Sequence, residues 1–87
     1  MKLMVIIVQD VEGDEVVQTL VEKGNRVTRM ASTGGFLKRG NVTLLTGVED
    51  ENVKIVVESL RGLFHKRNAE QHHATIFVVD MPHYEQI

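Results

Sequence analysis

Hydrophobic residues along the chain follow two repeat patterns, one typical of strands and one typical of helices. Lys2 to Gln9 contains a nearly continuous run of apolar, mostly β-branched residues, which predicts a strand buried on both faces. Apolar residues that recur on one helical face predict a helix over residues 11–24, with Asp10 as its N-cap. Gly24 stands where the C-terminus of a helix favours the left-handed conformation.

The next predicted strand is unusual because neither of its faces is purely apolar. In Asn25 to Ser32, Arg26 and Thr28 lie on one face, and Arg29 lies on the other. This pattern is typical of an edge strand, or of a strand whose exposed face has a function. The following strand, Asn41 to Val48, alternates more clearly, so we expect the glycine-rich segment between them to join two antiparallel strands.

The C-terminal half repeats the order of a helix followed by a strand. Asp50 is expected to cap a helix with a continuous apolar stripe. A polar connector, His65 to His73, leads to the strand Ala74 to Val79 and to the tail, Met81 to Ile87. With right-handed crossovers, the order β-α-β-β-α-β predicts one α+β domain over residues 1–87. Its fold is ferredoxin-like, with a four-stranded antiparallel sheet and two helices on one face.

This fold leaves the other face of the sheet without a covering layer. The first strand is apolar on both sides, so we expect a second subunit to cover the open face. A chain of 87 residues without cysteine also gains stability from association, because its own core is small and has no disulfide. The longest apolar run, Leu3 to Val8, is too short to span a membrane. We therefore expect a cytoplasmic oligomer with no membrane partner.

The charges are distributed unevenly along the chain. A net charge of -2 argues against binding to duplex nucleic acid, yet all 12 acidic residues lie outside Arg26 to Val48. That window contains four cations, Arg26, Arg29, Lys38 and Arg39. A local positive field attracts anions such as phosphates. Chance clustering on a solvated hairpin is the alternative explanation.

The connection ASTGGFLKRGN, residues 31–41, combines features that suit a nucleotide. Its paired glycines let a ligand approach the backbone, and Phe36 offers a ring on which a base can stack. The Asn41 amide matches the donor and acceptor of an adenine edge, and Arg26 supplies a planar donor fork for a phosphate. A plain turn followed by an ordinary strand start is the alternative, since no Walker or dinucleotide motif is present.

Three features, IIVQD at 6–10, TGGFLKRGNVT at 33–43 and Gly47, resemble the cyclic di-AMP receptor family of P-II-like signal transduction proteins. The resemblance runs from Met1 to about Arg67 and resumes at Ala74. It implies a homotrimer of ferredoxin-like subunits that binds cyclic di-AMP in the clefts between subunits. It further implies that the protein is not an enzyme, needs no cofactor, and relays ligand binding to a downstream protein that the sequence does not identify.

The same resemblance implies nine ligand contacts, distributed over the second, third and fourth strands, the connection and the tail. They are Arg26, Thr28, Gly35, Phe36, Leu37, Asn41, Gly47, Phe77 and Gln86. One departure concerns the long loop that family members carry before the last strand, which a short connector replaces here. Because that loop is implied to relay the signal, the output and the exact nucleotide remain open, and another nucleotide is an alternative ligand.

Histidines raise a second alternative, a trimeric metal-binding or scaffold protein. Adjacent histidines point to different sides of the chain, so we favour a solvated connector and expect no metal site. The threefold axis of a trimer could still bring three symmetry-related histidines together. The histidines concerned are His65, His72, His73 and His83. A hydrolase lacks support, because Asp10 and Asp14 are read as first-turn charges that the helix dipole favours, and no nucleophile has motif support.

Overall fold

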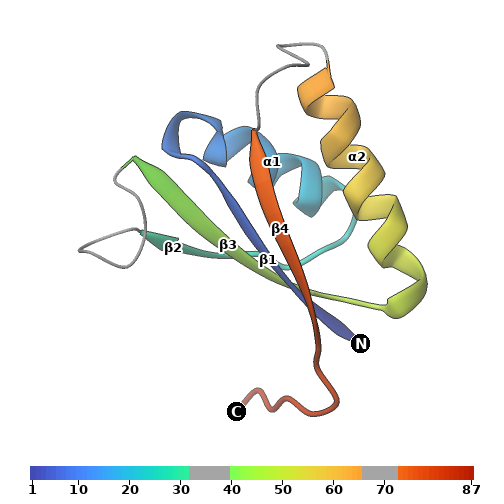
Figure 1. Cartoon of the computed structure of the whole chain (residues 1–87). Coiled ribbons are helices and arrows are strands. Elements are labelled where there is room, and N and C mark those ends of the chain that lie inside the picture. Colours follow the sequence, from blue (N-terminus) through green and yellow to red (C-terminus); the bar gives the residue numbers. More distant parts are fainter. Residues whose placement is uncertain (32–39, 66–72) are drawn as a thin grey trace.

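The structure is a computed structural model that describes residues 1–31, 40–65 and 73–87. The elements follow the predicted order (Figure 1). They are β1 (Lys2–Gln9), α1 (Asp10–Glu22), β2 (Thr28–Ala31), β3 (Asn41–Val48), the short 3-10 helix η1 (Asp50–Asn52), α2 (Val53–His65) and β4 (Ala74–Asp80).

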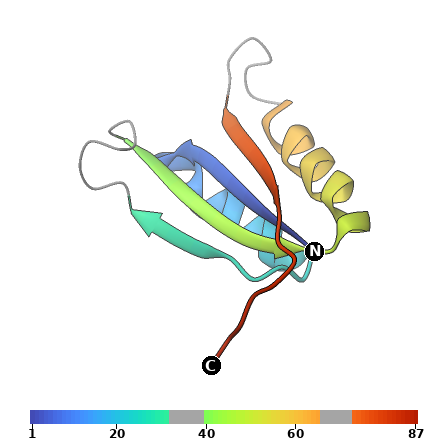
Figure 2. The ribbon, with the colours of Figure 1, turned by 60° about the horizontal axis from the view of Figure 1, so that its bottom comes forward.

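The four strands form one sheet in the order β2-β3-β1-β4. Every neighbouring pair is antiparallel, with Val5 opposite Leu45 of β3 on one side and Phe77 of β4 on the other. Thr28 of β2 lies opposite Leu45, so β2 and β4 are the two edges. Both helices lie on one face of this sheet (Figures 1 and 2). The predicted ferredoxin-like fold is confirmed.

The covered face of the sheet forms the core. Because side chains alternate along a strand, every second residue of β1 points toward the helices, and Met4 and Ile6 have no exposed surface. The apolar stripes of α1 and α2 close this layer from outside, as their periodicity predicts. The buried core consists of Met4, Ile6, Val8, Val16, Leu20, Val42, Leu44, Val48, Val56, Leu60 and Phe64.

The open face of the sheet is also largely apolar. Leu3, Val5 and Leu45 alternate with the core residues and are half-buried. Toward the β4 edge, Phe77 and Val79 have exposed fractions of 52% and 48%. Among the residues that the structure describes, this apolar layer is left partly exposed, and the expected oligomer would cover it.

The start of α1 differs from the prediction. Gln9, in an extended conformation, occupies the N-cap position and makes no side-chain cap. Asp10 is the first helical residue, and its backbone N–H donates to the carbonyl of Gly40 at 2.7 Å. Asp10 is not a cap because its carboxylate has a tertiary partner, described below.

The end of α1 agrees with the prediction. Gly24 has a φ of 85° and follows the C-cap residue Lys23. Its N–H donates to the carbonyl of Val21, and the N–H of Asn25 donates to that of Leu20. These two bonds form a Schellman motif, which satisfies the last carbonyls of the helix.

Two further boundaries move for tertiary reasons. Asp50 does not cap α2. It begins η1 instead, and its carboxylate lies 3.0 Å from the N-terminal ammonium of Met1. The second strand begins at Thr28 rather than at Asn25, because the chain first completes the helix end.

No helix in residues 1–31, 40–65 and 73–87 is long and apolar enough to cross a membrane. The cytoplasmic location and the single-domain organisation stay predictions.

Candidate functional site

A groove of about 740 Å³ lies where the C-terminal tail passes the end of the sheet. We call it the tail groove. The residues that line it include Arg26, Thr28, Gly47, Met81, Tyr84 and Gln86. Four of these are sequence-predicted ligand contacts: Arg26, Thr28, Gly47 and Gln86. Residues that lie sixty positions apart in the sequence thus share one surface.

Arg26 and Thr28 line the groove from the sheet side. Thr28 is the first residue of β2 and lies opposite Leu45 on the open face, and Arg26 stands two residues before it, where the chain enters the strand. The hydroxyl of Thr46 donates to the backbone carbonyl of Arg26 at 2.7 Å and ties this segment to β3. The Arg26 side chain is exposed, and within the described residues it makes no ion pair. Its guanidinium is therefore available for an anion.

Gly47 shapes the groove by allowing the tail to approach the sheet. A Cβ atom at this position would lie 3.1 Å from Cε of Met81 and 3.5 Å from Sδ of Met1. The N–H of Met81 donates to the carbonyl of Met1 at 3.1 Å, which fixes the root of the tail beside β1. Figure 2 shows the tail passing close to the N-terminus. A side chain here would be in tight contact with the flexible end of Met81, so glycine gives the tail room for its close approach.

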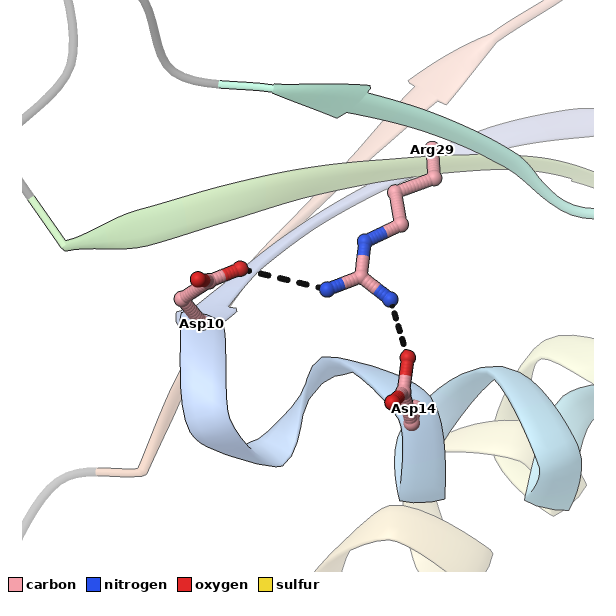
Figure 3. A network of polar contacts seen from close by, with 3 residues as sticks. All are labelled: Asp10, Asp14 and Arg29. Carbon is pink, nitrogen blue, oxygen red and sulfur yellow. Dashed lines mark hydrogen bonds and ion pairs between the residues drawn. The ribbon is translucent and has the colours of Figure 1, made fainter.

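Arg29 does not belong to the cationic surface that the sequence predicted. It points to the covered face, where Nη2 lies 3.1 Å from Oδ1 of Asp10 and Nη1 lies 2.5 Å from Oδ1 of Asp14 (Figure 3). The hydrogen bond to Asp14 is the main reason why the pKa of Arg29 is raised. Asp10 and Asp14 were read as dipole charges at the start of a helix, but they neutralise this arginine. The cationic window is narrower than its sequence suggests.

Asn41 lies at the opposite end of β3 from Gly47. Six residue steps along the strand separate them, a length of about 20 Å. Asn41 lines a second groove of about 440 Å³, together with Gln9 and His73. It shares the open face with Thr28, but one protomer does not bring it into the tail groove.

Phe77 lies on the same open face, at the β4 edge. Phe77 of β4 lies opposite Val5 of β1, and Val5 lies opposite Leu45 of β3. Leu45 in turn lies opposite Thr28 of β2. Phe77 and Thr28 are therefore on the two edges of one row that crosses the whole sheet. The remaining predicted contacts, Gly35, Phe36 and Leu37, lie outside the described residues.

His73 is not part of a solvated connector, contrary to the prediction. Its ring stacks on Phe64 with 4.9 Å between centroids and an interplanar angle of 1°. Its Nδ1 lies 3.4 Å from Oε1 of Glu12, and both side chains are largely buried. His72 lies outside the described residues. In the part of the chain that the structure describes, no group of three or more His, Cys, Asp or Glu side chains is placed to hold a metal.

Sequence reasoning missed the contribution of the tail. Met81, Tyr84 and Glu85 line the groove beside Gln86, although the predicted site took only Gln86 from this segment. The one available signal was the aromatic residue Tyr84 in the tail, MPHYEQI. Oε1 of Glu85 lies 3.4 Å from Nε2 of His83, so the tail also brings negative charge to the groove.

Solved structures with the same fold come from several bacteria. A functionally unknown protein from Pediococcus pentosaceus ATCC 25745 is 27% identical over 99% of this chain and 96% of its own, with a TM-score of 0.72. CPII, a nitrogen regulatory PII-like protein from Thiomonas intermedia K12 bound to ADP, AMP and bicarbonate, is 21% identical over 92% and 85%, with a TM-score of 0.71. A DUF3240 family protein from Shewanella baltica OS155 is 13% identical over 99% and 94%, with a TM-score of 0.70.

The last two likenesses support the fold alone. The profile of the cyclic-di-AMP receptor family, by contrast, matches residues 1–71, from β1 through the end of α2. Phe77 and Gln86 lie beyond the matched range. Since the match covers most of its length, this chain belongs to the cyclic-di-AMP receptor family.

Proposed function

We propose that this protein is a non-enzymatic sensor that binds cyclic di-AMP in the clefts between the subunits of a homotrimer. The observation that carries the proposal is the tail groove, which brings Arg26, Thr28, Gly47 and Gln86 together on one open surface. Membership of the cyclic-di-AMP receptor family supports the nucleotide as the ligand class.

Each polar group of the groove suits one part of a nucleotide. The Arg26 guanidinium provides a planar fork of donors for a phosphate, and the Thr28 hydroxyl can donate on the same side. The Gln86 amide has both a donor and an acceptor for a base edge or a ribose hydroxyl. This is the chemistry of binding and orientation, and it moves no proton and breaks no bond.

The distribution of the remaining predicted contacts supports a site shared between subunits. Asn41 lies about 20 Å from Gly47 along β3, and Phe77 lies on the opposite edge of the sheet. A single protomer therefore presents parts of a site rather than one complete site. Covering the apolar open face with further copies would stabilise each subunit and could bring these parts together across an interface.

Isothermal titration calorimetry with cyclic di-AMP, cyclic di-GMP and ATP tests the ligand. Saturable binding of cyclic di-AMP, weakened in Arg26→Ala, is the expected result. Arg61→Ala is the matched control, because Arg61 is an exposed arginine on α2 that pairs with Glu58 and lies outside the groove. No heat with cyclic di-AMP at high micromolar concentration would contradict the proposal.

Native mass spectrometry tests the assembly. The wild type is expected as a trimer, and Val79→Asp is expected to shift it toward monomer, because Val79 lies on the open face. Val11→Asp is the control, since Val11 is an exposed valine of α1. A monomeric wild type would contradict the proposal that the site is shared between subunits.

An adenine mononucleotide is the second candidate ligand. The neighbour CPII was solved with ADP and AMP, although at 21% identity the likeness supports only the fold. Adding ADP and AMP to the calorimetric panel separates the two ligands. A downstream protein that receives the bound state is part of the proposal for a sensor, and the sequence does not identify that protein.

A further inference from the structure

Tyr84 is the only aromatic residue among the described residues that line the tail groove. It lies three residues beyond Met81 and two residues before Gln86 in a tail without regular secondary structure. Its exposed fraction is 60%, so its ring is accessible rather than part of the core. This residue is not among the ligand contacts that the family resemblance implied.

The root of this tail is fixed in position. Met81 is held by the backbone bond to Met1 and packs against Gly47, where a Cβ atom would lie 3.1 Å from its Cε. Tyr84 follows this anchor by three residues and lines the wall of the groove. Arg26 and Thr28 border the same groove from the sheet side.

The two sides of the groove have complementary chemistry. The sheet side offers a guanidinium and a hydroxyl, which suit a phosphate. The tail side offers a phenol ring and an amide, which suit the face and the edge of a base. Base stacking on an aromatic ring tolerates any base, because every base has a π-face.

We infer that Tyr84 is a base-stacking residue of this site and covers the purine of a nucleotide whose phosphate lies at Arg26. The inference rests on the proposed function, and it assigns to the tail a direct role in holding the ligand. A residue that only packed against a second copy of the chain would act on assembly and not on the base.

The composition of the chain provides a direct spectroscopic test. The protein contains one tyrosine and no tryptophan, so its tyrosine emission comes from Tyr84 alone. Titration with cyclic di-AMP is expected to quench this emission saturably, with the same midpoint as calorimetry. Free N-acetyltyrosinamide titrated in parallel corrects for absorption by the nucleotide. Emission that stays unchanged while calorimetry reports binding would overturn the inference and leave the proposed function intact.

Four variants separate stacking from simple apolar contact. Tyr84→Ala and Tyr84→Leu are both expected to weaken binding about tenfold to a hundredfold, because neither keeps a π-face. Tyr84→Phe keeps the ring and is expected to bind within about threefold of the wild type. Ile87→Ala, a change at an exposed tail residue outside the groove, is the control and is expected to bind as the wild type does.

The outcomes distinguish this inference from the function on which it rests. If Tyr84→Ala or Tyr84→Leu binds with wild-type affinity, the stacking role of the ring is overturned. The proposed function as a cyclic di-AMP sensor is then unaffected. A lower oligomer mass of Tyr84→Ala in native mass spectrometry assigns Tyr84 to a subunit contact and also overturns it. Absence of cyclic di-AMP binding in the wild type removes both proposals together.

Discussion

Arg29 in β2 and Arg26 just before this strand lie toward opposite faces of the sheet, and they meet opposite surroundings. Arg29 points toward α1, where Asp10 and Asp14 neutralise it (Figure 3). Arg26 points to the open face, where it lines the tail groove with an exposed side chain. One arginine thus joins a strand to a helix, while the other remains available to a ligand. The difference shows that the face of a strand, and not the number of cations in a segment, decides which charge can act on a partner.

The same contrast holds for the apolar residues of the two faces. Leu44 on the covered face is completely buried, whereas its neighbour Leu45 on the open face is half-buried. The covered face therefore stabilises the protomer by itself, and the open face has apolar surface left for association. The covered face of the sheet thus stabilises the protomer, and the open face is the side available for association and for the proposed ligand.

The largest effect on stability is expected from a cavity in the core on the covered face. Leu44→Ala should lower the free energy of unfolding by about 2–5 kcal/mol, because it leaves a cavity in the core. Urea denaturation measures the loss, which should be the same at every protein concentration. Leu45→Ala is the matched control, and its effect should depend on protein concentration because it acts on assembly. A loss below about 1 kcal/mol at Leu44 would contradict this division between the faces.

Replacing each of the two arginines by alanine tests whether the two faces act independently. Arg26→Ala should weaken cyclic di-AMP binding about tenfold to a hundredfold, because it removes charged hydrogen bonds to a phosphate. Its melting temperature should stay close to that of the wild type. Arg29→Ala should show the reverse, a lower melting temperature with unchanged affinity. Equal losses of affinity in the two variants, measured by calorimetry, would show that the faces are not independent.

A smaller effect is expected from the acidic residue in the groove. Glu85→Gln should tighten binding of an anionic ligand about twofold to fivefold at low salt, since it removes a repulsive charge near Arg26. This gain in affinity should become smaller at higher salt, because salt screens the charge of Glu85. Calorimetry at two ionic strengths measures it, with Glu58→Gln on α2 as the control. Weaker binding in Glu85→Gln would instead indicate that the carboxylate accepts a hydrogen bond from the ligand.

The smallest effect concerns the ion pair of Lys2 and Asp80, which joins β1 to β4. The hydrogen bond between them lowers the pKa of Asp80 below its usual 3.8 and raises the pKa of Lys2 above its usual 10.5. The contribution of Asp80 to the stability of the folded state is therefore present above pH 3.8, and it is lost as the pH falls through the lowered pKa. The contribution of Lys2 is present below pH 10.5 and is lost as the pH rises through the raised pKa.

Asp80→Asn is the variant that tests this pair. It should be slightly less stable than the wild type at neutral pH, and the difference should vanish in strong acid. Thermal unfolding across the pH range measures the difference, with Glu51→Gln on η1 as the control. A stability difference that persists at the acid limit would mean that Asp80 acts through packing and not through its charge.

Periodicity predicted the fold because the apolar patterns of β1, α1 and α2 are long and unambiguous. The helix starts were wrong because a side chain that suits a cap also suits an ion pair. Asp10 pairs with an arginine from β2, and Asp50 pairs with the N-terminal ammonium. Such partners depend on contacts between distant parts of the chain, which no local pattern contains.

The candidate site was predicted unevenly for a similar reason. The resemblance named Arg26, Thr28, Gly47 and Gln86, and the structure brings them to one groove. Nothing local indicated that His73 would stack on Phe64 beside Glu12, because Glu12 lies in α1, Phe64 in α2 and His73 just before β4. Tyr84 was missed since an isolated aromatic residue in an irregular tail belongs to no repeat.

The position of β1 in the middle of the sheet has a consequence for synthesis in the cell. This strand is the most apolar segment of the chain, and it leaves the ribosome before either of its neighbours. Its partners β3 and β4 follow much later, with Lys2 finally pairing with Asp80. Closing such long loops slows folding, and an unpaired apolar strand can associate with other chains in the meantime. We therefore expect the yield of folded protein to depend most on how soon β3 and β4 reach β1.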